Sequence, residues 1–128
     1  MTKRTSAALL LAVILSAAPA LAHHTVANTH DVSKTVPLTG VVTSISWHNP
    51  HVIYHLSVPG EVGVDWEIES RHLQGMQRSG ITQDTIKVGE KVTFNVFLAL
   101  DGSHHAATDS VVLPDGRTLR IGTATGRP

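Results

Sequence analysis

Histidine is the residue type in this sequence that is best suited to metal binding or other chemistry. The chain of 128 residues contains nine histidines and no cysteine. Neutral imidazole is the commonest metal ligand in proteins, and it suits Cu, Zn and Ni. Without cysteine, the chain has no thiolate metal site, no disulfide and no cysteine nucleophile. The position of each histidine in the fold therefore decides what chemistry is open to it.

Spacing excludes one histidine pair as a metal site and allows another. Metal–nitrogen bonds of about 2.0–2.1 Å require the ligand nitrogens to lie within a few ångströms of one another. On an extended strand, four residues at ~3.3 Å each separate His51 from His55 by about 13 Å, so they cannot share an ion. His48 and His51 can share one, because Asn49-Pro50 between them predicts a turn.

The amino-terminal residues have the pattern of a secretory signal peptide. Lys3 and Arg4 precede an apolar run over residues 7–18, and Ala20-Leu21-Ala22 is a small-x-small cleavage signal. The apolar run is shorter than the ~20 residues of a membrane span, and no later run is long enough. We expect a signal peptide over residues 1–22 and a periplasmic or secreted mature chain of residues 23–128. An uncleaved anchor helix is the alternative.

Cleavage of the signal peptide would place histidine at the mature amino terminus. A cut after Ala22 makes His23 the first residue, followed by His24, and the free amine and ring of His23 could chelate copper. A cut after Ala20 would put His23 third, where amine, backbone amides and imidazole can hold Cu(II) or Ni(II) in square-planar geometry. The alternative is that residues 23–34, which show no periodicity, form only a flexible leader.

Alternating hydrophobicity predicts a chain built mainly of strands. We expect strands over residues 36–47, 51–58, 62–68, 92–99 and 105–113, and a short terminal strand over 118–121. Gly40, where the alternation changes parity, predicts a β-bulge. Ser70 is expected to cap a short helix over residues 71–78, which ends before Gly80.

This order and size match a small all-β barrel of five to six strands with one short helix, similar to the oligonucleotide/oligosaccharide-binding (OB) fold. We expect the barrel over residues 35–121 and a tail over residues 122–128. In such a barrel the loop at 47–51 and the loop at 101–105 lie at the same face. His48 and His51 should then approach His104 and His105, although neighbours on a strand point to opposite faces.

Several motifs along the mature chain resemble a family of uncharacterised, secreted bacterial proteins. The resemblance lies in Ala22-His23-His24, Gly40-x-Val42, Trp47-x-Asn49-Pro50-His51, Trp66-x-Ile68-Glu69, Gly89-Glu90-Lys91-Val92, Asp101-Gly102-Ser103 and Leu113-Pro114-Asp115-Gly116-Arg117. It implies one exported β domain and supplies no catalytic residues.

Composition and missing motifs argue against several classes of function. Without Lys3 and Arg4 the ten basic residues fall to eight against ten acidic ones, a net charge of −2, so a nucleic-acid partner is not expected. No nucleophile elbow or phosphate loop is present. The leading hypothesis is a non-catalytic module that binds a transition metal, Cu before Zn or Ni. The alternative is a protein- or glycan-interaction module that uses Trp47 and Trp66 on the same face.

Overall fold

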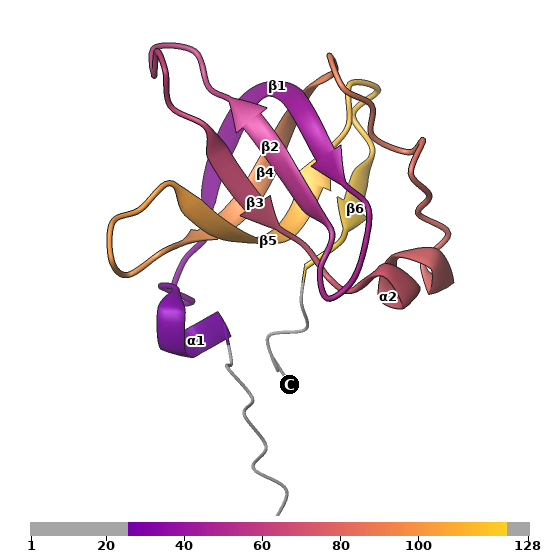
Figure 1. Ribbon diagram of the computed structural model, residues 1–128, viewed down its shortest axis with the longest axis horizontal. Coiled ribbons are helices and arrows are strands. Elements are labelled where there is room, and N and C mark those ends of the chain that lie inside the picture. Colours follow the sequence, from indigo (N-terminus) through magenta and orange to yellow (C-terminus); the bar gives the residue numbers. More distant parts are fainter. Residues whose placement is uncertain (1–25, 123–128) are drawn as a thin grey trace, which may run out of the picture.

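Six strands and two short helices make up residues 26–122, the part of the chain that the computed structural model describes (Figure 1). The helices are α1 (Val26–Thr29) and α2 (Leu73–Arg78). The strands are β1 (Val36–Ser46), β2 (Ile53–Ser57), β3 (Trp66–Glu69), β4 (Lys91–Leu98), β5 (His105–Val112) and β6 (Thr118–Arg120). The predicted signal peptide lies outside these residues.

The first five strands close into a barrel, which confirms the predicted fold class. The sheet order is β3-β2-β1-β4-β5-β6, and a parallel pairing between β3 and β5 completes the circle. β1 is long enough to serve two neighbours: residues 36–41 pair with β4 and residues 41–46 pair with β2. β6 adds to the free edge of β5.

The bend in β1 is displaced from the position that the alternation predicts. Leu38, Gly40 and Val42 are all buried, and the register with β2 shifts between Val42 and Ser44. The parity therefore changes after Val42 rather than at Gly40. Gly40 occupies an inward position because β2 passes so close that an added Cβ would overlap the carbonyl oxygen of Ser57.

Apolar side chains from all five barrel strands fill the interior, and Met76 of α2 packs among them. The fully buried set includes Val42, Val52, Tyr54, Leu56, Ile68, Met76, Ile86, Phe94, Val96, Val111 and Ile121. Of the helix, only Met76 is buried. The helix begins at Leu73 after His72, not after Ser70, because the Ser70 hydroxyl is buried and donates a hydrogen bond to the carbonyl oxygen of Ile121.

The segment predicted as a leader contains α1 and is joined to the barrel by backbone hydrogen bonds. His30 forms an isolated bridge with Ala99, and the Asp31 N–H donates to the Leu98 carbonyl oxygen at 2.9 Å. The Leu100 N–H donates to the Thr29 carbonyl oxygen at 2.9 Å. These bonds extend the end of β4 and hold α1 beside the β4–β5 loop (Figure 1). Within residues 26–122, no helix has the length and apolar character needed to cross a membrane.

Candidate functional site

Two strand pairings and one loop hydrogen bond bring distant polar residues to the end of β3. Glu69 is the last residue of β3, and its backbone partner on β2 is Ile53. The loop before β2 is tied to the same place, because the Ser70 N–H donates to the Val52 carbonyl oxygen at 2.9 Å. His51 therefore lies beside Glu69. On the other side of β3, the parallel register pairs Glu67 with His105.

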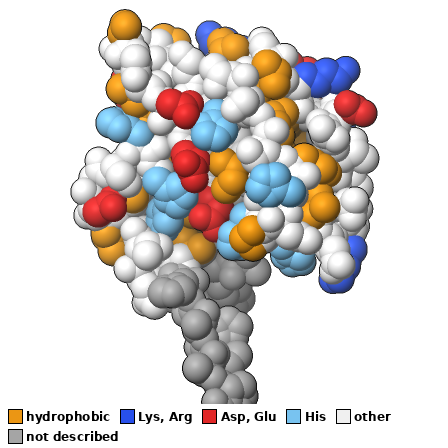
Figure 2. All heavy atoms as spheres, in the orientation of Figure 1, with side chains coloured by type: hydrophobic (Ala, Val, Ile, Leu, Met, Phe, Trp, Pro, Cys, Tyr) orange, Lys and Arg blue, Asp and Glu red, His pale blue; other side chains and the backbone are white. Residues whose placement is uncertain are grey.

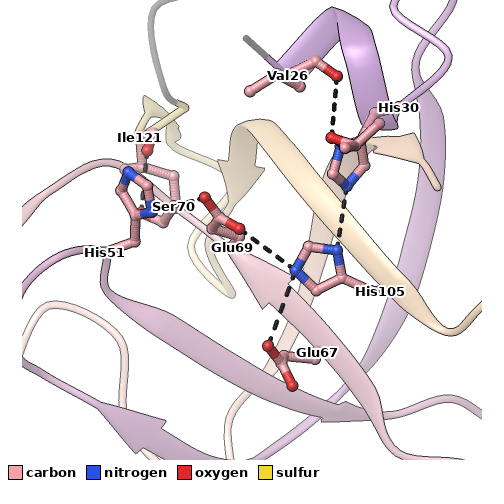
Figure 3. Close-up of polar contacts among 9 residues, drawn as sticks. Val26, His30, His51, Glu67, Glu69, Ser70, His105 and Ile121 are labelled. Atoms are coloured by element: carbon pink, nitrogen blue, oxygen red, sulfur yellow. Dashed lines mark hydrogen bonds and ion pairs between the residues drawn. The ribbon is translucent and has the colours of Figure 1, made fainter. Parts of the chain in front are cut away.

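The carboxylate of Glu69 lies between two imidazole rings that come from different parts of the chain (Figure 3). His51 Nδ1 is 2.7 Å from Glu69 Oε1, and His105 Nε2 is 3.3 Å from Glu69 Oε2. Glu67 Oε1 is farther from His105 Nε2, at 3.8 Å. The Glu69 side chain thus connects the 47–52 loop to the start of β5.

A third histidine continues this network. His30 Nε2 is 3.2 Å from His105 Nδ1, and His30 Nδ1 is 2.8 Å from Thr29 Oγ1. The His30 side chain is supplied by the segment that follows α1, and the residue is only 5% exposed. Both ring nitrogens of His105 therefore have a partner, with a carboxylate on one side and a buried imidazole on the other.

These side chains line a hollow of about 570 Å³ on the surface of the barrel. Its lining is Val26, Thr29, His30, His51, Glu69, Ala99, Asp101, Ser103 and His105. Figure 2 shows that histidine and acidic side chains alternate on this face of the molecule, over the region of β2 and β3. The same face carries a further pair, with His55 Nδ1 2.6 Å from Asp65 Oδ2.

The charges in the hollow are set by these contacts. The hydrogen bond to Glu69, reinforced by the Glu69 charge, raises the pKa of His105 above its ordinary value. The hydrogen bond from His105, together with the nearby His51 ring, lowers the pKa of Glu69. Burial, followed by the charge on His105, lowers the pKa of His30. Of His30 and His105, His105 therefore carries a proton more readily, and His30 favours the neutral form.

The predicted ligand histidines do not all meet. His51 and His105 come together at Glu69, whereas His48 is exposed and its Nδ1 lies 3.0 Å from the neighbouring Asn49 carbonyl oxygen. His104 points away from His105 and packs edge-on against Trp66, with ring centroids 5.0 Å apart. His23 and His24 lie outside the described residues.

The two tryptophans of the alternative hypothesis differ in how far they are buried. Trp66 is 8% exposed, and its indole N–H donates to Glu61. Trp47 is partly buried and packs against the hydrophobic core. Trp66 is therefore too buried to serve as an open stacking face, whereas Trp47 keeps part of its surface exposed.

Sequence reasoning missed Glu69, Glu67 and His30 as members of the site. The acidic residues alternate on one strand face, a pattern that also fits a solvated sheet edge. His30 lies in a stretch with no periodicity, so no pattern assigned it a partner. The parallel pairing of β3 with β5 was the missing information, because it alone sets Glu67 and Glu69 beside His105.

Comparison with known proteins places the chain in a family. A search of curated proteins and a search of solved structures each found no match. Residues 11–108 match the family model described as a family of unknown function (DUF6152), and these residues include the 47–52 loop, β3 and the start of β5. The chain therefore belongs to this family of unknown function, DUF6152.

Proposed function

We propose that this protein is an exported, non-catalytic module that binds one transition metal ion, Cu(II) before Zn(II) or Ni(II), at the hollow. The ligands are His51 Nδ1, the Glu69 carboxylate and His105 Nε2. The observation that carries the proposal is the position of Glu69 between two imidazoles from distant segments. Two nitrogen donors and one carboxylate form a donor set suited to Cu(II), Zn(II) and Ni(II).

One of the two donor separations already equals that around a four-coordinate ion, and the other is shorter. With bonds of about 2.0–2.1 Å, neighbouring ligand atoms on such an ion lie about 3.3–3.4 Å apart. The distance from His105 Nε2 to Glu69 Oε2 is 3.3 Å, and that from His51 Nδ1 to Glu69 Oε1 is 2.7 Å. In the structure each imidazole nitrogen shares a proton with a carboxylate oxygen of Glu69. A bound metal ion would take the place of these protons. Affinity should therefore rise with pH, since the ligand nitrogens must lose their protons.

His30 has a positioning role in this proposal. When His105 binds the ion through Nε2, its Nδ1–H donates to His30 Nε2, and the His30 Nδ1–H donates to Thr29 Oγ1. Such outer partners fix the tautomer and the orientation of a ligand histidine. The lowered pKa of His30 suits this role, because only a neutral ring can accept the proton of His105.

Binding requires the side chains to close around the ion. Among residues 26–122, no three His, Asp or Glu side chains already surround one point at ligand distances. His51 and Glu69 have room to rotate, because their side chains are 38% and 22% exposed and line the open hollow. Export rests on the pattern of residues 1–22, and we expect the mature chain in the periplasm or outside the cell.

Isothermal titration of Cu(II), Zn(II) and Ni(II) into the mature protein tests the proposal. We expect one ion per chain with micromolar or tighter affinity, and a loss of at least tenfold in His51→Ala and in His105→Ala, or about 1.4 kcal/mol each. His72→Ala is the matched control, because His72 is exposed and lies outside the hollow. Absence of binding tighter than micromolar, or equal affinity in all variants, would overturn the proposal.

A further inference from the structure

A second carboxylate, that of Asp101, lines the same hollow as the proposed ligands. Asp101 lies in the loop between β4 and β5, shortly before His105. The Leu100 N–H donates to the Thr29 carbonyl oxygen at 2.9 Å, and the Ala99 N–H donates to the His105 carbonyl oxygen at 3.3 Å. Because Thr29, Ala99 and His105 also line the hollow, the backbone on either side of Asp101 is anchored beside it.

The Asp101 side chain carries a negative charge that acts on the histidines of the site. Hydrogen bonds from the side chain and the backbone of Ser103 lower the pKa of Asp101, and the Ser103 N–H lies 2.9 Å from Asp101 Oδ1. The hydrogen bond to Glu69 is the main cause of the raised pKa of His105, and the charge on Asp101 adds to it. Asp101 is therefore ionised at neutral pH and lies within electrostatic reach of His105.

The proposed ligand set gains a suitable fourth member in this carboxylate. His51 and His105 supply two nitrogen donors, and Glu69 supplies one oxygen donor. Cu(II) and Ni(II) favour square-planar or tetragonal sets of nitrogen and oxygen donors, and an Asp101 oxygen would make the set two of each. Two carboxylates would also balance the charge of a divalent ion, and charges removed from water are costly unless they are balanced.

We infer that Asp101 is a fourth ligand of the ion and that ion binding draws the β4–β5 loop toward Glu69. This inference rests on the proposed metal-binding function. The Asp101 residue is exposed, so its carboxylate is free to turn into the hollow. One carboxylate oxygen can keep the hydrogen bond from the Ser103 N–H while the other binds the ion. The ion would then join three segments of the chain, namely the 47–52 loop, the end of β3 and the β4–β5 loop.

Cu(II) titration of Asp101→Asn tests the inference. Asparagine keeps an acceptor for the Ser103 N–H but loses the charge. We expect one Cu(II) per chain in the wild type and at least about tenfold weaker binding in Asp101→Asn, a loss that persists in 1 M sodium nitrate. Salt at about 1 M shortens the Debye length to about 3 Å, so it screens a charge that does not touch the ion. Asp65→Asn is the matched control, because Asp65 pairs with His55 outside the hollow.

Hydrogen exchange of the backbone amides gives a second readout. Cu(II) should slow exchange in both the 47–52 loop and the β4–β5 loop of the wild type, because ligands in both loops would be held by one ion. In Asp101→Asn we expect the slowing to persist in the 47–52 loop and to be lost in the β4–β5 loop. A charge that acts only at a distance would not produce this local difference.

Two sets of results separate this inference from the proposed function. A loss in Asp101→Asn that is no larger than in Asp65→Asn, or that disappears in 1 M sodium nitrate, would overturn the inference while leaving the site of His51, Glu69 and His105 in place. Unchanged exchange in the β4–β5 loop of the wild type would also overturn it. Absence of Cu(II) binding in the wild type would instead remove the proposed function, and the inference with it.

Discussion

Replacing the carboxylate of Glu69 by an amide should destabilise the protein most between pH 4.5 and 6.5. In the wild type, Glu69 faces His51 at 2.7 Å and His105 at 3.3 Å. The Glu69→Gln variant keeps the shape of the side chain and one acceptor oxygen, but it loses the negative charge. The attraction to a protonated His105 is then lost, and one imidazole faces an amide NH₂ group.

The pH window follows from the two pKa shifts. The pKa of His105 is raised above 6.5, so its stabilisation is complete below about pH 6.5 and is lost as the pH rises through the folded-state value. The pKa of Glu69 is lowered below 4.5, so its stabilisation is complete above about pH 4.5 and is lost as the pH falls through the folded-state value. Both groups are charged between these limits.

The magnitude follows from the exposure of the pair. Hydrogen bonds to charged groups contribute about 1.5–3 kcal/mol, and fully exposed ion pairs about 0.2–1 kcal/mol. The side chains of Glu69 and His105 are 22% and 32% exposed, which places their contact between these cases. We expect Glu69→Gln to lower the free energy of unfolding by about 1–2 kcal/mol at pH 5.5 and by less than about 0.5 kcal/mol at pH 8.5.

Urea unfolding at the two pH values measures this difference, and a thermal scan should show a shift of about 4–8 °C per kcal/mol. Glu67→Gln is the matched control on the same strand, because Glu67 lies 3.8 Å from His105 Nε2 and its side chain is 49% exposed. We expect Glu67→Gln to change stability by less than about 0.5 kcal/mol at either pH. If Glu69→Gln costs the same at pH 5.5 and pH 8.5, the attraction between charges is not the reason for the loss, and the reasoning fails.

Three further predictions concern the barrel, and urea unfolding tests each. Tyr54→Phe should raise the free energy of unfolding by about 1 kcal/mol, because the buried hydroxyl finds no hydrogen-bond partner among residues 26–122; a loss above about 1 kcal/mol would mean that it has one. Phe94→Ala should cost about 3–5 kcal/mol, since its buried ring packs 5.4 Å from that of Tyr54, and a loss below about 1 kcal/mol would contradict its core position. Gly40→Ala should lower the free energy of unfolding by about 1–3 kcal/mol, because the added methyl group would overlap the Ser57 carbonyl. A neutral effect would show that β2 can move. Val41→Ala is the control, since Val41 is an exposed neighbour on the same strand.

Local sequence patterns were sufficient for the elements of the barrel. The alternation in β2, where Tyr54 and Leu56 are buried, follows directly from the two-residue period of a strand. The same rule gives β4, with Val92, Phe94 and Val96 inside. These patterns need no knowledge of partners, because each strand must place one face toward a core. The bulge in β1 was harder to locate: the change of parity predicts it at Gly40, whereas the register with β2 shifts between Val42 and Ser44.

Only part of the candidate site was accessible to the same reasoning. The likeness to an OB barrel predicts that the loop containing His51 and the start of β5 share one face. In the structure His51 and His105, the first residue of β5, both contact Glu69. It could not choose between His104 and His105. The register of β5 against β3 makes that choice, since it turns His105 toward Glu67 and Glu69 and leaves His104 against Trp66.

The sequence by itself determined the composition of the site and the strands that carry it. It supplied nine histidines, no cysteine and an alternating pattern typical of a mainly β domain. The tertiary structure decided which histidines meet, and it added Glu69 and His30 to them. The physical reason is that side-chain proximity across β3 and β5 depends on a pairing between residues almost forty positions apart. No local pattern encodes that register, because it is set only when the whole barrel closes.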